Sequence, residues 1–250
     1  MPLRTDQQRR RDTPPRPRND RAPTAAAPSN AQPAAKSGAR PPEPRWPALI
    51  AILAVGGLYL SLHADLVLGP RWLFPAAIGV LLVPTLVTHR TGRHDLNRLF
   101  GLGISAVLTV GMVLSVILLV SALPSHRQSP SALLLSAASL WFTNILVFAL
   151  WYWRLDAGGP HGRDSRVRHA EGAFLFPQMT MPSVVGDGDR EPGWSPHFVD
   201  YLFLAFNTST AFSPTDTPAL ARWAKAMMML QSMISLAVLA LLAARAVNML

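Results

Sequence analysis

The segment that most restricts the fold of this chain is Leu99–Leu123, a run of 25 residues without a charged side chain. About 20 apolar helical residues cross the hydrocarbon core of a bilayer, so a run of this length is typical of a membrane span. Other apolar segments approach or reach the same length. In chain order we predict five transmembrane segments: Trp46–Leu62, which can extend to Leu68, then Trp72–Thr88, Leu99–Leu123, Ser131–Trp153 and Ala224–Leu250. The sequence therefore predicts an all-α fold, a polytopic bundle of helices in contact with a lipid bilayer.

The composition agrees with a membrane protein. Only 15% of the residues are charged, compared with about 25% in an average soluble domain. The chain has no cysteine, which excludes disulfides and thiolate metal sites. The net charge of +9 does not indicate nucleic-acid binding, because the basic residues gather beside the apolar segments, where they set membrane orientation.

The first 45 residues form a basic tail rich in Pro and Ala, with ten Lys or Arg and few large apolar residues. Such a stretch cannot bury enough apolar surface to offset its ordering entropy, so we predict a disordered tail. Residues 46–153 form the predicted four-helix transmembrane region. They are followed by a polar loop over residues 154–197, which is rich in Gly, Pro and charge.

The distribution of basic residues predicts the orientation. With the tail inside, eighteen Lys and Arg lie in cytoplasmic segments (the tail, 89–98 and 154–197), and two lie in the outer connections 70–71 and 124–130. Basic residues favour the cytoplasmic side of a membrane. We therefore predict a cytoplasmic N-terminus in a bacterial plasma or inner membrane.

The last segment, residues 198–250, has the most patterned chemistry. A short apolar stretch, Phe198–Phe212, leads through a Thr-rich turn to Asp216 and then to the long final segment. This order resembles the pore module of the two-helix potassium channels, in which a short pore helix precedes a Thr-Val-Gly-Tyr-Gly-Asp filter and the next helix lines the pore. The residues that the resemblance places at the pore-like turn are Thr208, Thr210, Ala211, Phe212, Ser213, Pro214, Thr215 and Asp216.

The filter itself departs from that family. Ser213 and Thr215 stand at its two glycine positions, and Pro214 stands at its aromatic position. Glycine makes the filter's backbone dihedrals inexpensive, whereas Pro fixes φ near −65°. The resemblance therefore implies a pore-module fold, and the degenerate turn argues against potassium selectivity.

Four other stretches carry a second resemblance. They are Trp141-Phe-Thr-Asn144, Leu150-Trp-Tyr-Trp-Arg-Leu-Asp156-Ala-Gly-Gly-Pro160, Phe174-Leu-Phe-Pro-Gln178 and Thr210-Ala-Phe-Ser-Pro-Thr-Asp216. With these stretches the chain is similar to a group of bacterial multi-pass membrane proteins that have no assigned activity. This resemblance indicates relatives and implies no function.

Polar residues inside the apolar segments need partners, and Asn144, Gln231 and Ser235 are the main examples. Gln231 and Ser235 are four residues apart, so they share one helix face. That face lines a polar path in one interpretation. In the other, which we favour, it makes hydrogen bonds between helices.

No motif predicts catalysis. The histidines lack the spacing of a helical zinc site, and the chain has no recognisable triad, phosphate-binding loop or paired carboxylates within the membrane. We expect no enzyme activity, no cofactor and no metal.

Two functions remain open from the sequence. One is a channel-like pore protein, which would be a homo-oligomer because a single module supplies only part of a filter ring. The other is a non-conducting scaffold or accessory protein that uses the same fold for packing and for binding a protein partner through residues 154–197.

The topology of residues 198–212 also stays open from the sequence. The segment has 15 residues, a length that suits either a short span or a re-entrant helix. A potassium-channel pore helix enters from outside, which conflicts with a cytoplasmic 154–197 loop. A full span there, or an early segment that fails to cross, would resolve the conflict. Because both solutions return the chain to the inside, we predict a cytoplasmic C-terminus.

Overall fold

A computed structural model describes residues 43–122, 129–165, 172–180, 194–210 and 216–247, which belong to one packed unit. In these ranges every regular element is a helix, and Phe174 and Ala219 form an isolated antiparallel bridge. The predicted all-α fold is confirmed. The helices are α1 (Trp46–Ser61), η2 (Ala64–Leu66), α2 (Leu73–Arg90), α3 (His94–Ala122), α4 (Pro130–Leu155), η4 (Asp156–Gly158), α5 (Gly159–Asp164), η5 (Pro177–Met179), α6 (Phe198–Thr210) and α7 (Arg222–Val247).

Four helical segments are long and apolar enough to cross a membrane: Leu73–Arg90, His94–Ser121, Ser131–Asp164 and Arg222–Ala244. The first predicted span is shorter than the others, because α1 has 16 residues, about 24 Å at 1.5 Å per residue. It ends where Leu62 adopts an extended conformation and the chain continues into η2. These helices indicate a membrane protein that contacts lipid.

Local sequence sets the helix boundaries. Ser129 caps α4, since its hydroxyl accepts a hydrogen bond from the Ala132 amide at 3.3 Å, and Pro130 occupies the first turn, where its missing N–H costs nothing. Gly92 adopts a positive φ of 69° in the turn between α2 and α3, a conformation that glycine reaches without strain.

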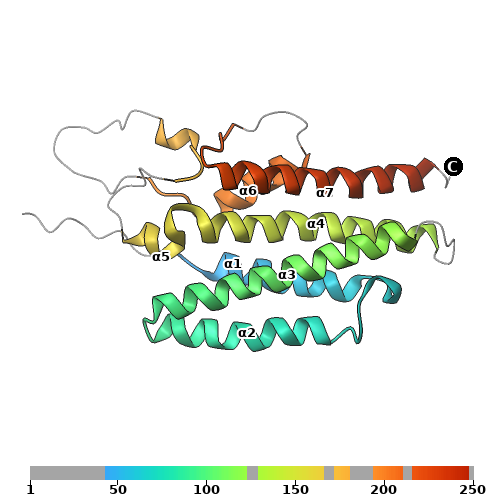
Figure 1. The fold of residues 1–250 in the computed structure, drawn as a ribbon, viewed down its shortest axis with the longest axis horizontal. Helices are drawn as coiled ribbons and strands as arrows, with labels where there is room; N and C mark the ends of the chain where they lie inside the picture. The colour runs from blue at the N-terminus through green and yellow to red at the C-terminus, as the bar shows by residue number, and fades with distance from the viewer. Residues whose placement is uncertain (1–42, 123–128, 166–171, 181–193, 211–215, 248–250) are drawn as a thin grey trace, which may run out of the picture. The chain divides into compact units, whose positions relative to one another are not determined.

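The central helix of the bundle is α4, which packs against α1, α3, α6 and α7. On one side of it, α2 packs mainly on α3, where the ring of Phe74 lies over Gly111. On the other side lie α6 and α7. Figure 1 shows the long helices lying along one another, with α4 between α3 and α7.

The helices α1 and α7 run in the same direction (Figure 1). We call the end of the bundle where both begin the proximal end, and the opposite end the distal end. Near the distal end Val238 of α7 belongs to one apolar cluster with Tyr59, Leu62 and Leu133. The described start of α1 and end of α7 thus lie at opposite ends of the bundle, whereas the prediction of two cytoplasmic chain ends requires them to lie on the same side of the membrane.

Candidate functional site: a re-entrant helix and its polar partners

The helix α6 enters the bundle at the proximal end. The Phe198 amide donates to Glu43 Oε1 at 2.7 Å, and the Phe198 ring lies 5.8 Å from the Trp153 ring, centroid to centroid. The helix is 13 residues long and ends beside the middle of α7, where Ser232 Oγ donates to the Thr208 carbonyl at 3.1 Å.

The chain then returns to the end from which it came. The Leu220 amide donates to the Ala173 carbonyl at 2.7 Å, and the Ala173 amide donates to Asp156 at the end of α4. From there α7 begins at Arg222. In the described residues, the segment that sequence left open between a span and a re-entrant helix thus enters and leaves at one end of the bundle, which is the course of a re-entrant helix.

The structure describes only part of the predicted pore-like turn. The hydroxyls of Thr208 and Thr210 donate to carbonyls of their own helix, those of Leu204 at 2.8 Å and Phe206 at 3.0 Å. Asp216 is exposed on the return. Ala211, Phe212, Ser213, Pro214 and Thr215 lie outside the described residues.

Gln231 of α7 is the centre of a buried polar network. Its amide nitrogen donates to the Ala205 carbonyl at 2.6 Å and to Ser209 Oγ at 2.8 Å. Its side-chain oxygen accepts from the Tyr152 hydroxyl at 2.6 Å. The side chain is fully buried, so Gln231 joins α4, α6 and α7 with all its side-chain groups in use.

Asn144 of α4 continues this network. Its amide nitrogen donates to the Gln231 carbonyl at 3.1 Å and to Ser235 Oγ at 2.8 Å, and Asn144 Oδ1 has no partner among the described residues. The structure therefore brings together the three polar residues that the sequence singled out, Asn144, Gln231 and Ser235, and buries all of them.

A buried ion pair closes the proximal end of the same region. Arg163 of α5 lies 3.1 Å from Glu43 Oε2, and both side chains are less than 5% exposed. Arg163 also donates to the carbonyls of Trp153 at 2.8 Å and Asp156 at 3.1 Å. The remaining oxygen of Glu43 accepts from Trp153 Nε1 at 2.8 Å. Both charges thus have several hydrogen-bond partners, as a buried pair requires, although Arg163 Nε has none among the described residues.

Asp156 ties the re-entrant helix to α4. The Tyr201 hydroxyl of α6 donates to Asp156 Oδ2, and the Arg163 guanidinium lies 5.0 Å from the centre of the Tyr201 ring. The tight reversal after α4 depends on positive φ angles at Gly158 and Gly159, which glycine adopts easily.

Sequence reasoning missed this charged group. Glu43 and Arg45 were assigned to the disordered tail, yet both pack on the bundle, and Arg45 pairs with Asp164 at 2.8 Å. Arg163 lies in the segment predicted as a polar loop, whose described residues include short helices and the buried Phe174. Residues 1–42 of the predicted tail lie outside the described residues. The available signal was the Asp156-Ala-Gly-Gly-Pro160 stretch, whose acid and paired glycines indicate a specific turn.

Among the described residues, no group of three or more His, Asp or Glu side chains is arranged to hold a metal ion. The polar atoms of the site are mostly amides, hydroxyls and a paired acid and base. This arrangement of bonded polar groups is suited to holding a short helix rigidly inside an apolar bundle. No family model, curated protein or solved structure matches this chain. The two resemblances found in the sequence therefore support proposals only.

Proposed function

We propose that this protein is a non-conducting membrane scaffold, in which a pore-module-like helix serves for packing. The observation that carries the proposal is the direction of the polar groups of α6 and α7. Gln231 and Ser235 face inward, where they are bonded to α4 and α6. They do not line an open path through the single chain.

The outward face of α7 supports the same proposal. Met229, Met233 and Leu236 form an exposed apolar stripe, each more than half exposed. In an oligomer built like a pore module, the last helix would line the central path, and this stripe would face it. A lining of thioether and alkyl groups does not replace the hydration shell of an ion.

The scaffold would present its proximal end to partners. That end carries Arg45, the 89–98 turn and the described parts of residues 154–197. Because basic residues favour the cytoplasmic side, we assign the proximal end to the cytoplasm of a bacterial cell. A protein partner would then bind there.

Ion flux tests the proposal directly. Purified protein in liposomes or planar bilayers should give no conductance for K⁺, Na⁺ or Cl⁻ above that of protein-free membranes. Single-channel currents would overturn the scaffold assignment. A Gln231→Leu variant controls for accidental leaks, because it removes the polar amide without adding a charge. A current that is the same in the parent protein and in this variant does not pass along the face of α7 that carries Gln231.

The second candidate is a channel-like pore protein that is a homo-oligomer. The course of α6 favours it, since a short helix that enters and leaves at one end precedes the pore-lining helix in that family. The side differs, because the family's pore helix enters from outside, whereas α6 enters from the proximal end that we assign to the cytoplasm. Ser213, Pro214 and Thr215 argue against potassium selectivity here as well. A current without preference for K⁺ over Na⁺, from a protein that migrates as an oligomer, would support this candidate.

Orientation has its own test. With five helices between the two ends and the N-terminus in the cytoplasm, a reporter fused after Leu250 should be active only outside the cytoplasm. A second reporter inserted near Gly186, between α5 and α6, should be active only inside. If both reporters are active on the same side, α6 or α1 does not run as described.

A further inference from the structure

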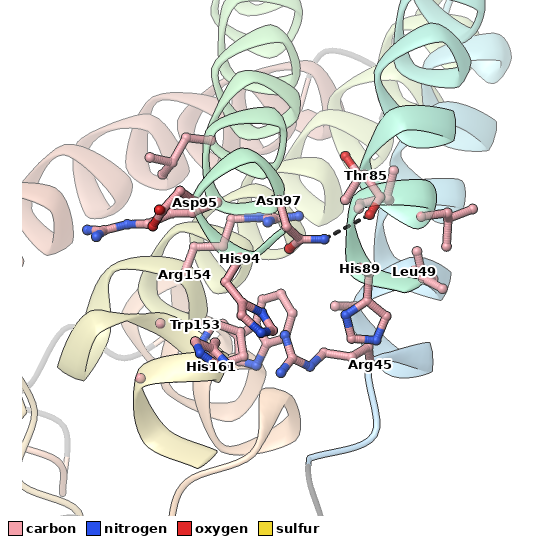
Figure 2. A pocket seen from close by; sticks show the side chains of 18 of the residues that line it. Arg45, Leu49, Thr85, His89, His94, Asp95, Asn97, Trp153, Arg154 and His161 are labelled. Atoms are coloured by element: carbon pink, nitrogen blue, oxygen red, sulfur yellow. Dashed lines mark hydrogen bonds between the residues drawn. The ribbon is translucent and has the colours of Figure 1, made fainter. Parts of the chain in front are cut away.

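A second polar region lies on the opposite side of α4, in a cavity of about 230 Å³ at the proximal end. Its walls come from α1, α2, α3, the end of α4 and α5. Figure 2 shows the side chains that gather there. The basic and imidazole groups lining it are Arg45, His89, His94, Arg98, Arg154 and His161, and Asp95 is the one carboxylate among its lining residues.

Arg154 differs from Arg45 and Arg163 at this end. Arg45 is paired with Asp164 and Arg163 with Glu43. Arg154 has no ion-pair or hydrogen-bond partner among the described residues, although the Nε atoms of all three arginines are buried without a partner. Its guanidinium lies 5.4 Å from the centre of the Trp153 ring. Arg154 is only partly exposed, and a charge held there without a counter-charge is costly, so an anion at this place would be favoured.

The position of Arg154 is fixed by a close approach to α3. A β-carbon added to Gly101 would lie 1.7 Å from Arg154 Nη1, so the guanidinium occupies space that only glycine leaves free. In Figure 2 the side chain reaches from α4 toward α3, where Asn97 lies. Arg154 therefore extends between the helices and forms part of the cavity wall.

Much of the remaining cavity wall is apolar. Ile52 of α1, Leu82 of α2 and Leu102 of α3 line it, beside the polar Thr85 and Asn97. At the rim, the rings of His94 and His161 stack with centroids 3.6 Å apart and join α3 to α5. A ligand that fits this arrangement has an anionic group on an apolar stem.

We propose that this cavity binds the phosphate group of an anionic phospholipid, held by Arg154 and Arg45, with its first acyl carbons against the leucine and isoleucine wall. Basic pockets between transmembrane helices on the cytoplasmic side suit anionic headgroups. The proximal end is the one that carries most of the basic residues, which places the cavity at the depth of a leaflet's headgroups. The site is independent of the scaffold proposal, because lipid binding and ion flux are measured separately.

The test uses the full chain, purified in a neutral detergent, with bound lipids counted by native mass spectrometry. The parent protein should retain phosphatidylglycerol in preference to phosphatidylcholine. Arg154→Gln should weaken phosphatidylglycerol binding about tenfold or more, because a hydrogen-bonded charge is lost. Gly101→Ala keeps every charge and displaces the guanidinium, so it should also weaken binding. Arg71→Gln is the matched control, since it removes an exposed charge from the distal end and should leave binding unchanged.

Three outcomes would overturn the proposal. One is equal retention of the two lipids by the parent protein. Another is equal phosphatidylglycerol binding by the parent, Arg154→Gln and Arg71→Gln. The third is displacement of phosphatidylglycerol by millimolar inorganic phosphate, which would assign the cavity to a free anion. Circular dichroism of each variant separates loss of the site from loss of the fold, and a misfolded Arg154→Gln leaves Gly101→Ala to decide.

Discussion

The two sides of α4 use polar groups in opposite ways. Toward α6 and α7, Asn144, Tyr152 and Gln231 bond one another across helices and are buried. Toward α1, α2 and α3, Arg154 faces a cavity and has no partner among the described residues. Polar groups that satisfy one another hold a bundle together without a ligand. Single atoms on the packed side, Asn144 Oδ1 and Arg163 Nε, lack a partner among the described residues, but both side chains make other hydrogen bonds. Arg154 makes none there and lies at a cavity, which is why we propose that a ligand binds to it. The side of α4 toward α6 and α7 is thus held by its own polar groups, and the side toward α1, α2 and α3 is the proposed binding side.

The largest expected effect comes from breaking the ion pair on the packed side. Glu43→Ala leaves Arg163 as an uncompensated buried charge and removes the acceptor of the Phe198 amide. We expect a loss of about 3 to 5 kcal/mol in the free energy of unfolding, the usual cost of removing one partner of a buried pair. Thermal unfolding in detergent, followed by circular dichroism, measures it.

The double variant Glu43→Gln with Arg163→Gln is the control for that experiment. Glu43→Gln keeps the size of the side chain, and Arg163→Gln is shorter but retains an amide donor. The pair removes both charges together, so it should recover part of the lost stability. If Glu43→Ala unfolds at the same temperature as the parent, the proximal end of α6 is held by other contacts.

A smaller effect is expected in the middle of the same side. Gln231→Leu removes the partners of the Tyr152 hydroxyl and Ser209, which are then buried without those bonds. We expect a loss of about 1 to 3 kcal/mol. Met233→Leu, on the exposed stripe of the same helix, is the control and should change stability by less than about 0.5 kcal/mol. If Gln231→Leu and Met233→Leu have equal melting temperatures, the network does not stabilise the fold.

The smallest effect on stability is expected on the cavity side. Arg154→Gln removes a charge that has no partner among the described residues, so the free energy of unfolding should change by no more than about 1 kcal/mol in either direction. The melting temperature without added lipid measures this. A loss as large as that of Glu43→Ala would show that Arg154 holds the bundle together, and the contrast between the two sides of α4 would fail.

The transmembrane helices could be predicted from the sequence because a charge-free run of sufficient length has few alternatives to a membrane helix. The need of Asn144, Gln231 and Ser235 for partners was also visible, since polar groups in lipid are costly. The partners that these residues have in the structure could not be predicted, because sequence spacing relates residues within one helix and says little about which helices meet.

Other features could not be predicted for physical reasons. A 15-residue apolar segment fits a tilted span and a re-entrant helix equally well, so the course of α6, and with it the side of the C-terminus, depended on contacts distant in the sequence. Glu43 and Arg163 lie in polar stretches without periodicity, 120 residues apart. Their pairing arises only when α4 brings the two stretches to the same end of the bundle.

The re-entrant course of α6 has a consequence for biosynthesis. The helix has 13 residues, too few to be inserted as an independent span. Its partners Glu43 and Asp156 precede it in the chain, whereas Gln231 and Ser232 belong to α7 and are synthesised later. We therefore expect α6 to dock against α4 first and to complete its hydrogen bonds only after α7 has been inserted, so its last contacts form out of the order of translation.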